Sequence, residues 1–162
     1  MFKRILVPTD GSDLSAAAAR KAVEFAKSLN ASVCAFHSMS MFASKPTGVE
    51  FTPIITGQDA EKTARLYLSV VEGYAKEAGV PYQSFSAFHE SPYRAIIEAA
   101  EEHHCDLIFL GSHGRGAVSS LFVGSVTQQV MSHSYIPVLV YRDEKIASRM
   151  KHVTQESRQY RI

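Results

Sequence analysis

Short apolar runs alternate with longer amphipathic segments along most of the chain. Five runs have the length and composition of buried strands, at about residues 5–7, 33–37, 82–88, 106–110 and 136–141. Between them, apolar residues recur every three or four positions, which predicts helices over about 12–29, 58–78, 91–103 and 125–134. The polar segment 38–57 carries prolines and glycines and is predicted to be a long loop.

This alternation of strands and helices predicts an α/β domain with a parallel sheet covered on both faces. Right-handed crossovers permit a Rossmann-like, open, five-stranded sheet with strand order 3-2-1-4-5. Pro137 cannot donate a backbone hydrogen bond, so the fifth strand is expected at an edge of the sheet. Ligands bind where the chain reverses direction between neighbouring strands, here at the carboxyl ends of the first and fourth strands.

Glycines cluster directly after the fourth predicted strand. The stretch Gly111-Ser112-His113-Gly114-Arg115-Gly116 is followed, after nine residues counted from Gly114, by Gly124-Ser125. Glycines at such spacing let a backbone direct several N–H groups at one anion, most often a phosphate. Gly124 and Ser125 open the next predicted helix, whose N-terminal N–H groups would face the same anion. The spacing therefore predicts a nucleotide-phosphate site.

Several polar residues near this edge have two interpretations each. Asp10 follows the first strand, where it could accept hydrogen bonds from ribose hydroxyls or cap the turn before the first helix; we favour the ribose contact. Arg115 could pair with terminal phosphates or remain solvated on the loop. His113 could donate to a phosphate or take no part.

Absent motifs narrow the function. The chain has no G-x-x-x-x-G-K-[ST] sequence and no G-x-G-x-x-G after the first strand. A hydrolase built from Ser112, His113 and Asp10 is disfavoured, because no G-x-S-x-G elbow exists and neighbouring loop side chains rarely meet. No general base is evident. We therefore expect no catalytic residue and no metal held by protein side chains, in a site that holds a nucleotide rather than cleaving it.

Length, charge and composition limit the classes of protein to which this chain can belong. The 162 residues suggest one domain over 1–142 and a polar tail over 143–162, either disordered or associated with a dimer. A net charge of +1 gives no field that would recruit nucleic acid or a membrane, and no run approaches the ~18 apolar residues of a membrane span. We expect a cytoplasmic protein. Cys34 and Cys105 are expected to be reduced, mostly buried thiols.

On the basis of these motifs, the chain resembles the universal stress protein family from Lys3 to about Arg142. The ATP-binding branch of that family carries G-x2-G-x9-G-[S/T], which Gly111, Gly114, Gly124 and Ser125 match in full. Further stretches carry the resemblance: Ile5-Leu6-Val7-Pro8-Thr9-Asp10-Gly11-Ser12, Gly124-Ser125-Val126-Thr127 and Pro137-Val138-Leu139-Val140.

The resemblance implies a set of ligand contacts. Pro8, Thr9 and Asp10 would line an adenosine pocket, with Asp10 near the ribose, and the backbone of His37 and Ser38 would meet the adenine. The phosphates of ATP, with Mg²⁺ held by those phosphates, would be wrapped by Leu110, Gly111, His113, Gly114, Arg115, Gly124, Ser125, Val126 and Thr127. Members of the family commonly dimerise through the last strand, here residues 138–141.

The expected function is therefore that of a homodimeric, ATP-binding stress-response protein. Bound nucleotide would change a loop or the dimer surface, and so change contacts with an unknown protein partner. Two alternatives remain open at this point: a slow ATPase or phosphoryl-transfer enzyme, and a nucleotide-free dimer that acts only through protein contacts. The loop 38–57 would cover the nucleotide or a partner.

Overall fold

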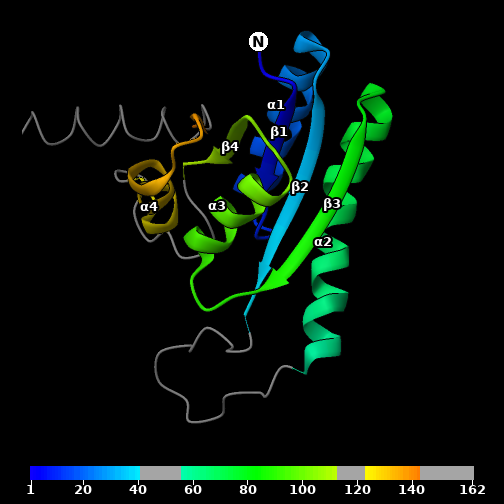
Figure 1. Ribbon diagram of the computed structural model, residues 1–162. Coiled ribbons are helices and arrows are strands. Elements are labelled where there is room, and N and C mark those ends of the chain that lie inside the picture. The colour runs from blue at the N-terminus through cyan, green and yellow to red at the C-terminus, as the bar shows by residue number, and fades with distance from the viewer. Residues whose placement is uncertain (41–55, 113–122, 143–162) are drawn as a thin grey trace, which may run out of the picture.

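The computed structural model describes residues 1–40, 56–112 and 123–142 (Figure 1). They form an open parallel sheet of five strands in the order β3-β2-β1-β4-β5. This confirms the predicted Rossmann-like order and the edge position of the last strand. The strands are β1 (Arg4–Pro8), β2 (Ser32–Met39), β3 (Tyr82–Phe88), β4 (Leu107–Gly111) and β5 (Val138–Tyr141). The helices are α1 (Asp13–Leu29), α2 (Gly57–Ala78), α3 (Pro92–Glu102) and α4 (Ser125–His133).

Helices cover both faces of the sheet (Figure 1). Alternate residues of each strand point to opposite faces. On one face, Ile5 and Val7 of β1 pack with α1 and α2 in the larger apolar cluster. On the other face, Leu6 and Ile108 pack with α3 and α4. Both faces of the central strands are therefore buried, as a parallel sheet requires.

Capping residues set the ends of α1 and α2. Ser12 caps α1, and its hydroxyl oxygen accepts a hydrogen bond from the Ser15 N–H at 3.1 Å. Asn30 ends α1 in the left-handed conformation, and Gly79 ends α2 in the same way.

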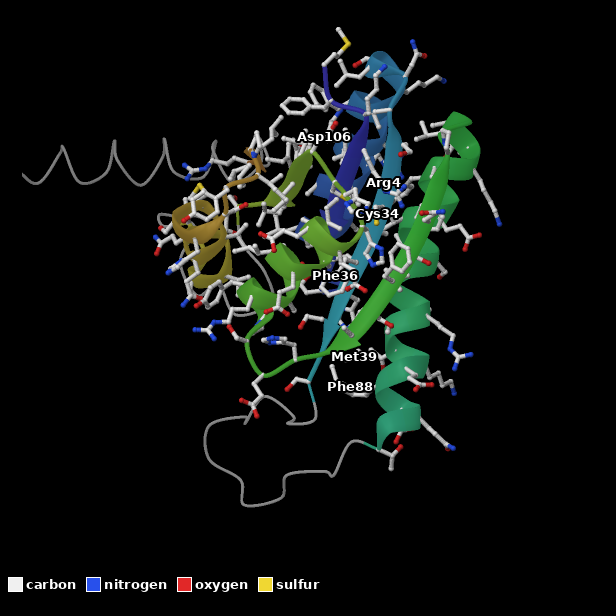
Figure 2. All side chains as sticks on the ribbon, viewed as in Figure 1. Arg4, Cys34, Phe36, Met39, Phe88 and Asp106 are labelled. Atoms are coloured by element: carbon white, nitrogen blue, oxygen red, sulfur yellow. The ribbon has the colours of Figure 1, made fainter. Side chains whose placement is uncertain are left out.

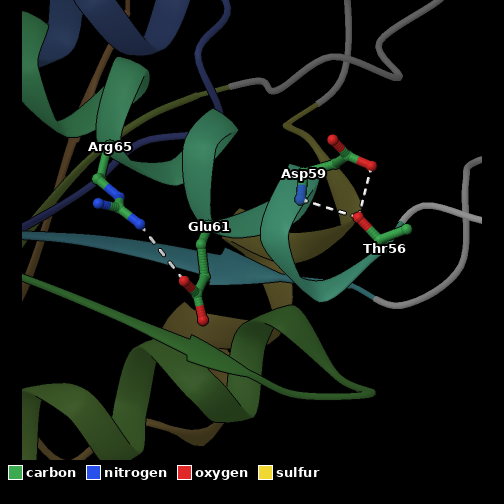
Figure 3. A network of polar contacts seen from close by, with 4 residues as sticks. All are labelled: Thr56, Asp59, Glu61 and Arg65. Atoms are coloured by element: carbon green, nitrogen blue, oxygen red, sulfur yellow. Dashed lines mark hydrogen bonds and ion pairs between the residues drawn. The ribbon is translucent and has the colours of Figure 1, made fainter.

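Thr56 caps α2 through a small polar network (Figure 3). Its hydroxyl accepts from the Asp59 N–H at 3.2 Å and donates to the Asp59 carboxylate at 2.6 Å. One turn further on, Arg65 and Glu61 form an exposed ion pair at 3.4 Å. This cap fixes the start of α2 one residue earlier than the sequence predicted.

Other boundaries differ from the predictions by one or two residues. Strand β2 continues to Met39, two residues beyond the predicted end, because residues 37–39 pair with β3. The predicted loop 38–57 is therefore shorter at both ends, and its residues 41–55 lie outside the described part. Asp106 precedes β4, and its carboxylate accepts from the backbone N–H groups of Lys3 at 2.7 Å and Arg4 at 3.0 Å.

Candidate functional site

The carboxyl ends of β1 and β4 lie side by side at the point where the chain reverses direction. Ile5 and Leu6 of β1 pair in parallel with Leu107 and Ile108 of β4, so the two strands run toward the same edge of the sheet. Pro8 ends β1, and Thr9 continues the ladder because its N–H donates to the Phe36 carbonyl at 2.9 Å. The fold thus brings together the two segments that the sequence singled out.

Thr9 is buried, and its hydroxyl is used within the protein. That hydroxyl accepts from the Gly11 N–H at 3.3 Å. It donates to the Ser15 hydroxyl at 3.1 Å, because the Ser15 proton is already directed at the Ser12 carbonyl at 2.9 Å. Thr9 therefore shapes the turn before α1.

Asp10 caps the same turn. One carboxylate oxygen, Oδ1, accepts from the backbone N–H of Ser12 at 3.0 Å and from its hydroxyl at 2.6 Å. Ser12 in turn caps α1, so the two residues act in series. The capping role that the sequence left open for Asp10 is thus filled, and the residue is half-buried after the end of β1.

His37 joins β2 to the end of β1. Its Nδ1 lies 2.8 Å from the Thr9 carbonyl. A carbonyl oxygen can only accept, so Nδ1 carries the proton and donates. The His37 ring also meets the ring of Tyr67 edge-on, with centroids 5.1 Å apart. Ser38, half-buried, follows on β2 and pairs with Ala87 of β3.

The end of β4 is tied to the start of α4 at two points. The Gly124 N–H donates to the Ser112 carbonyl at 2.7 Å, and the Thr127 hydroxyl donates to the Gly111 carbonyl at 2.9 Å. Ser112 and Thr127 are both buried. These bonds hold the two ends of the glycine-rich segment together, so Thr127 positions the backbone of β4.

The first turn of α4 faces the same edge. Its helical ladder begins with the Gln128 N–H donating to the Gly124 carbonyl at 2.9 Å. The N–H groups of residues 125–127 precede that ladder and carry the positive end of the helix dipole. Ser125 is exposed, whereas Val126 packs partly into the core beneath. Leu110 is buried in that core, so only its backbone can reach a ligand.

Three of the expected phosphate residues, His113, Gly114 and Arg115, lie outside the described residues. Gly111, Gly124, Ser125 and Thr127 lie at the two described ends of this segment, and their contacts with phosphates stay a prediction. Gly111 itself is the last residue of β4, paired with Tyr141.

The sequence analysis did not assign Ser15 or Tyr67 to this region. Ser15 is a small polar residue that becomes buried only through tertiary contacts. The Tyr67 ring contacts His37, which lies 30 residues away in the sequence. The three-residue offset of Ser15 from Ser12 is the one local signal that could have been used.

Comparison with known proteins identifies the family. The model of the universal stress protein family matches residues 1–142. Universal stress protein MJ0531 of Methanocaldococcus jannaschii is 31% identical over 147 residues, which cover 90% of this chain and 85% of that protein. Universal stress protein YxiE of Bacillus subtilis is 32% identical, over 88% of this chain and all of the relative. The chain belongs to the universal stress protein family.

Solved structures share the fold. A universal stress protein in complex with cAMP has a TM-score of 0.65 at 23% identity, covering 86% of this chain and 97% of that one. The universal stress protein of Archaeoglobus fulgidus in complex with dAMP has a TM-score of 0.63 at 22% identity, with the same coverage. Across the residues that the structure describes, no helix combines the length and apolar character needed to span a membrane.

Proposed function

We propose that this chain is a nucleotide-binding regulatory protein of the ATP-binding branch of its family, acting as a cytoplasmic homodimer. The observation that carries the proposal is the bond between Gly124 and Ser112, at 2.7 Å, which anchors the glycine-rich segment beside the first turn of α4. In support, the backbone N–H groups at the N-terminus of α4 directly follow this bond, and such groups commonly bind a phosphate.

The adenosine would lie between β1 and β2, next to these phosphate groups. Thr9 and Asp10 follow β1 at this edge, and His37 reaches from β2 to the Thr9 carbonyl. Support comes from two relatives in fold that were solved with adenine nucleotides, cAMP in one and dAMP in the other. Mg²⁺ would be held by the phosphates of ATP.

The first test is isothermal titration of nucleotide-stripped protein with ATP, AMP, cAMP and GTP, each with and without Mg²⁺. We expect ATP to bind more tightly than AMP, because its additional phosphates reach the glycine-rich segment. The gain should be lost in Gly124→Leu, whose side chain would stand at the N-cap of α4. Gly73→Leu is the matched control, because a Cβ at exposed Gly73 meets nothing within 4 Å.

The outcomes separate the candidate functions. Absence of binding by any nucleotide would contradict the proposal and favour an interaction dimer that uses no nucleotide. Equal affinities for ATP and AMP would show that the additional phosphates of ATP do not bind at the glycine-rich segment. Turnover of ATP that persists in Gly124→Leu would indicate a contaminating enzyme rather than catalysis by this chain.

The homodimer would form through the outer edge of β5. In the described part of the chain, β5 pairs with β4 alone. The carbonyls of Pro137 and Tyr141 accept from the N–H groups of Ile108 in β4 and of Ser112 directly after it. The alternation along a strand therefore directs the backbone N–H of Val140 outward.

Val140→Pro therefore removes an outward donor and spares the ladder with β4. Sedimentation velocity should show a dimer for the wild-type protein and a shift to monomer for Val140→Pro, with the circular dichroism spectrum unchanged. A wild-type protein that sediments as a monomer would refute this arrangement.

ATP would change what the dimer contacts. Hydrogen exchange measured with and without ATP should show altered protection in residues 41–55 or at β5, and sedimentation should show whether association strengthens. If exchange and association are both unchanged at saturating ATP, a nucleotide-dependent switch is excluded and the protein merely stores the nucleotide.

A further inference from the structure

The outer face of α2 carries exposed apolar side chains. Leu66 and Val70 have 64% and 40% of their surface exposed, whereas the buried residues of this helix, such as Leu68 and Val71, lie on its opposite face. With that buried face the helix packs against α1, β2 and β3. Figure 2 shows side chains along α2 that point away from the sheet. Leu66 and Val70 are one helical turn apart, so they form one apolar patch.

Gly73 continues the outer face by one further turn. It is exposed, and a Cβ built there would meet nothing within 4 Å. The packing of a single chain therefore does not require glycine at this position, although glycine is less favourable within a helix than any residue except proline. The missing side chain leaves a gap on the helix surface, and such gaps let a second helix approach closely.

Two charged residues flank the apolar patch. Two ion pairs within α2 neutralise four of its other charges: Glu61 with Arg65 at 3.4 Å, and Glu72 with Lys76 at 2.8 Å. Lys62 and Glu77 are exposed and form no ion pair with any residue that the structure describes. Lys62 lies one turn before Leu66, and Glu77 lies one turn after Gly73. The outer face thus has a positive end and a negative end.

The order of these residues is self-complementary. Consider two antiparallel α2 helices whose two-fold axis is level with the midpoint between Leu66 and Gly73. Leu66 then lies opposite Gly73 of the second copy, and Lys62 lies opposite its Glu77, because each couple is equally far from the axis. The symmetry repeats both contacts. One helix supplies both the projecting side chain and the gap, and both charges, so the partner that fits it is a second copy.

We propose that the outer face of α2 binds the same face of a second copy of this chain, antiparallel, with Leu66 packed over Gly73 and Lys62 paired with Glu77 across the interface. At 1.5 Å per residue, this face is about 22 Å long. It is small beside the roughly 1,200–2,000 Å² that stable interfaces bury. The contact is therefore weak, and it forms toward millimolar rather than low micromolar concentration.

This interface lies away from the other sites. The helix α2 covers β2 and β3, whereas β5 is the opposite edge of the sheet. Contact through α2 therefore adds to a dimer through β5 and does not compete with it. The proposal depends neither on that dimer nor on nucleotide binding.

The first test is sedimentation equilibrium of the full-length protein from low micromolar to millimolar concentration. We expect the average mass to rise with concentration, and the rise to shrink on addition of salt, because exposed ion pairs are screened. The same rise should occur in Val140→Pro. A mass that stays constant in the wild-type protein, or a rise that disappears in Val140→Pro, would overturn the proposal.

Exchange of the two charges tests the pairing. Lys62→Glu and Glu77→Lys each bring like charges together at both ends of the interface, so each should weaken association at least several-fold. The double variant restores opposite charges and should restore association. Glu101→Lys is the matched control, because it reverses an exposed acidic residue in the last turn of α3. The pairing is refuted if the double variant remains as weak as the single ones, or if Glu101→Lys weakens association as much as Glu77→Lys.

The contact between Leu66 and Gly73 has its own comparison. Leu66→Ala removes the projecting side chain and keeps α2 folded, because alanine favours a helix and Leu66 is exposed. It should weaken the association at least several-fold. Met131→Ala removes another exposed apolar side chain, from α4, and should leave the rise in mass unchanged. Equal effects of the two substitutions would contradict packing of Leu66 at the interface.

Discussion

Gly11 offers a sharp test of the geometry at the candidate nucleotide site. It lies in the turn between β1 and α1 with φ of +75°, and a Cβ built there would approach three ring carbons of Tyr67 closer than 3.0 Å. Gly79, which ends α2, has a similar φ of +68°, but a Cβ there meets nothing within 4 Å. The two glycines share the backbone requirement and differ in the steric one.

The expected costs follow from this difference. A non-glycine residue in the left-handed conformation costs about 1–2 kcal/mol, which both Gly11→Ala and Gly79→Ala would lose. Forcing a methyl group into the Tyr67 ring adds about 1–3 kcal/mol, as in other overpacked sites. The ring cannot swing away freely, because it packs edge-on against His37. Gly11→Ala should therefore be the less stable variant by about 1–3 kcal/mol.

Equilibrium unfolding in guanidinium chloride at one protein concentration measures both variants. The gap should close in a Tyr67→Ala background, where the added methyl group meets no ring. Equal losses in the two glycine variants would show that the turn carries no contact with α2. A gap that survives removal of the Tyr67 ring would place its origin elsewhere in the turn.

Three further substitutions test single bonds, each measured by the free energy of unfolding. Thr127→Val leaves the Gly111 carbonyl without its donor and should cost about 1–3 kcal/mol, while Thr127→Ser should retain most of that stability. Asp106→Ala removes the two carboxylate oxygens that accept from the Lys3 and Arg4 N–H groups and should cost about 1–3 kcal/mol; Asp106→Asn keeps one acceptor oxygen and should lose part of that stability. Burial raises the pKa of Tyr82, so its contribution should be full below pH ~10 and decline as the pH rises through the folded pKa; Tyr82→Phe should flatten that decline.

The periodicity of the sequence predicted most of the fold, because local rules determine where most strands and helices form. A parallel sheet buried on both faces gives short continuous apolar runs, such as Ile5 to Val7. The ends of α1 and α2 also follow from local sequence, since Ser12, Asn30 and Gly79 cap these helices through their own side chains or backbone. The strand order followed from handedness rules together with the position of Pro137.

The features that the sequence did not predict depend on contacts between distant segments. Met39 extends β2 because it pairs with Phe88 and packs against Ala60 and Ala64 of α2. The bond from Thr127 to the Gly111 carbonyl likewise joins two elements. Neither contact has a local pattern, so no reading of periodicity would have found it.

The fold brings together the two segments that the sequence singled out, and the sequence did not show how their side chains are used. Glycine spacing and the switch point indicated where a nucleotide would lie, yet Thr9 and Thr127 use their hydroxyls to brace the backbone. Side chains that look like ligand contacts in the sequence thus serve to hold main-chain groups in place. A backbone-built site of this kind tolerates change at its side chains better than change at its glycines.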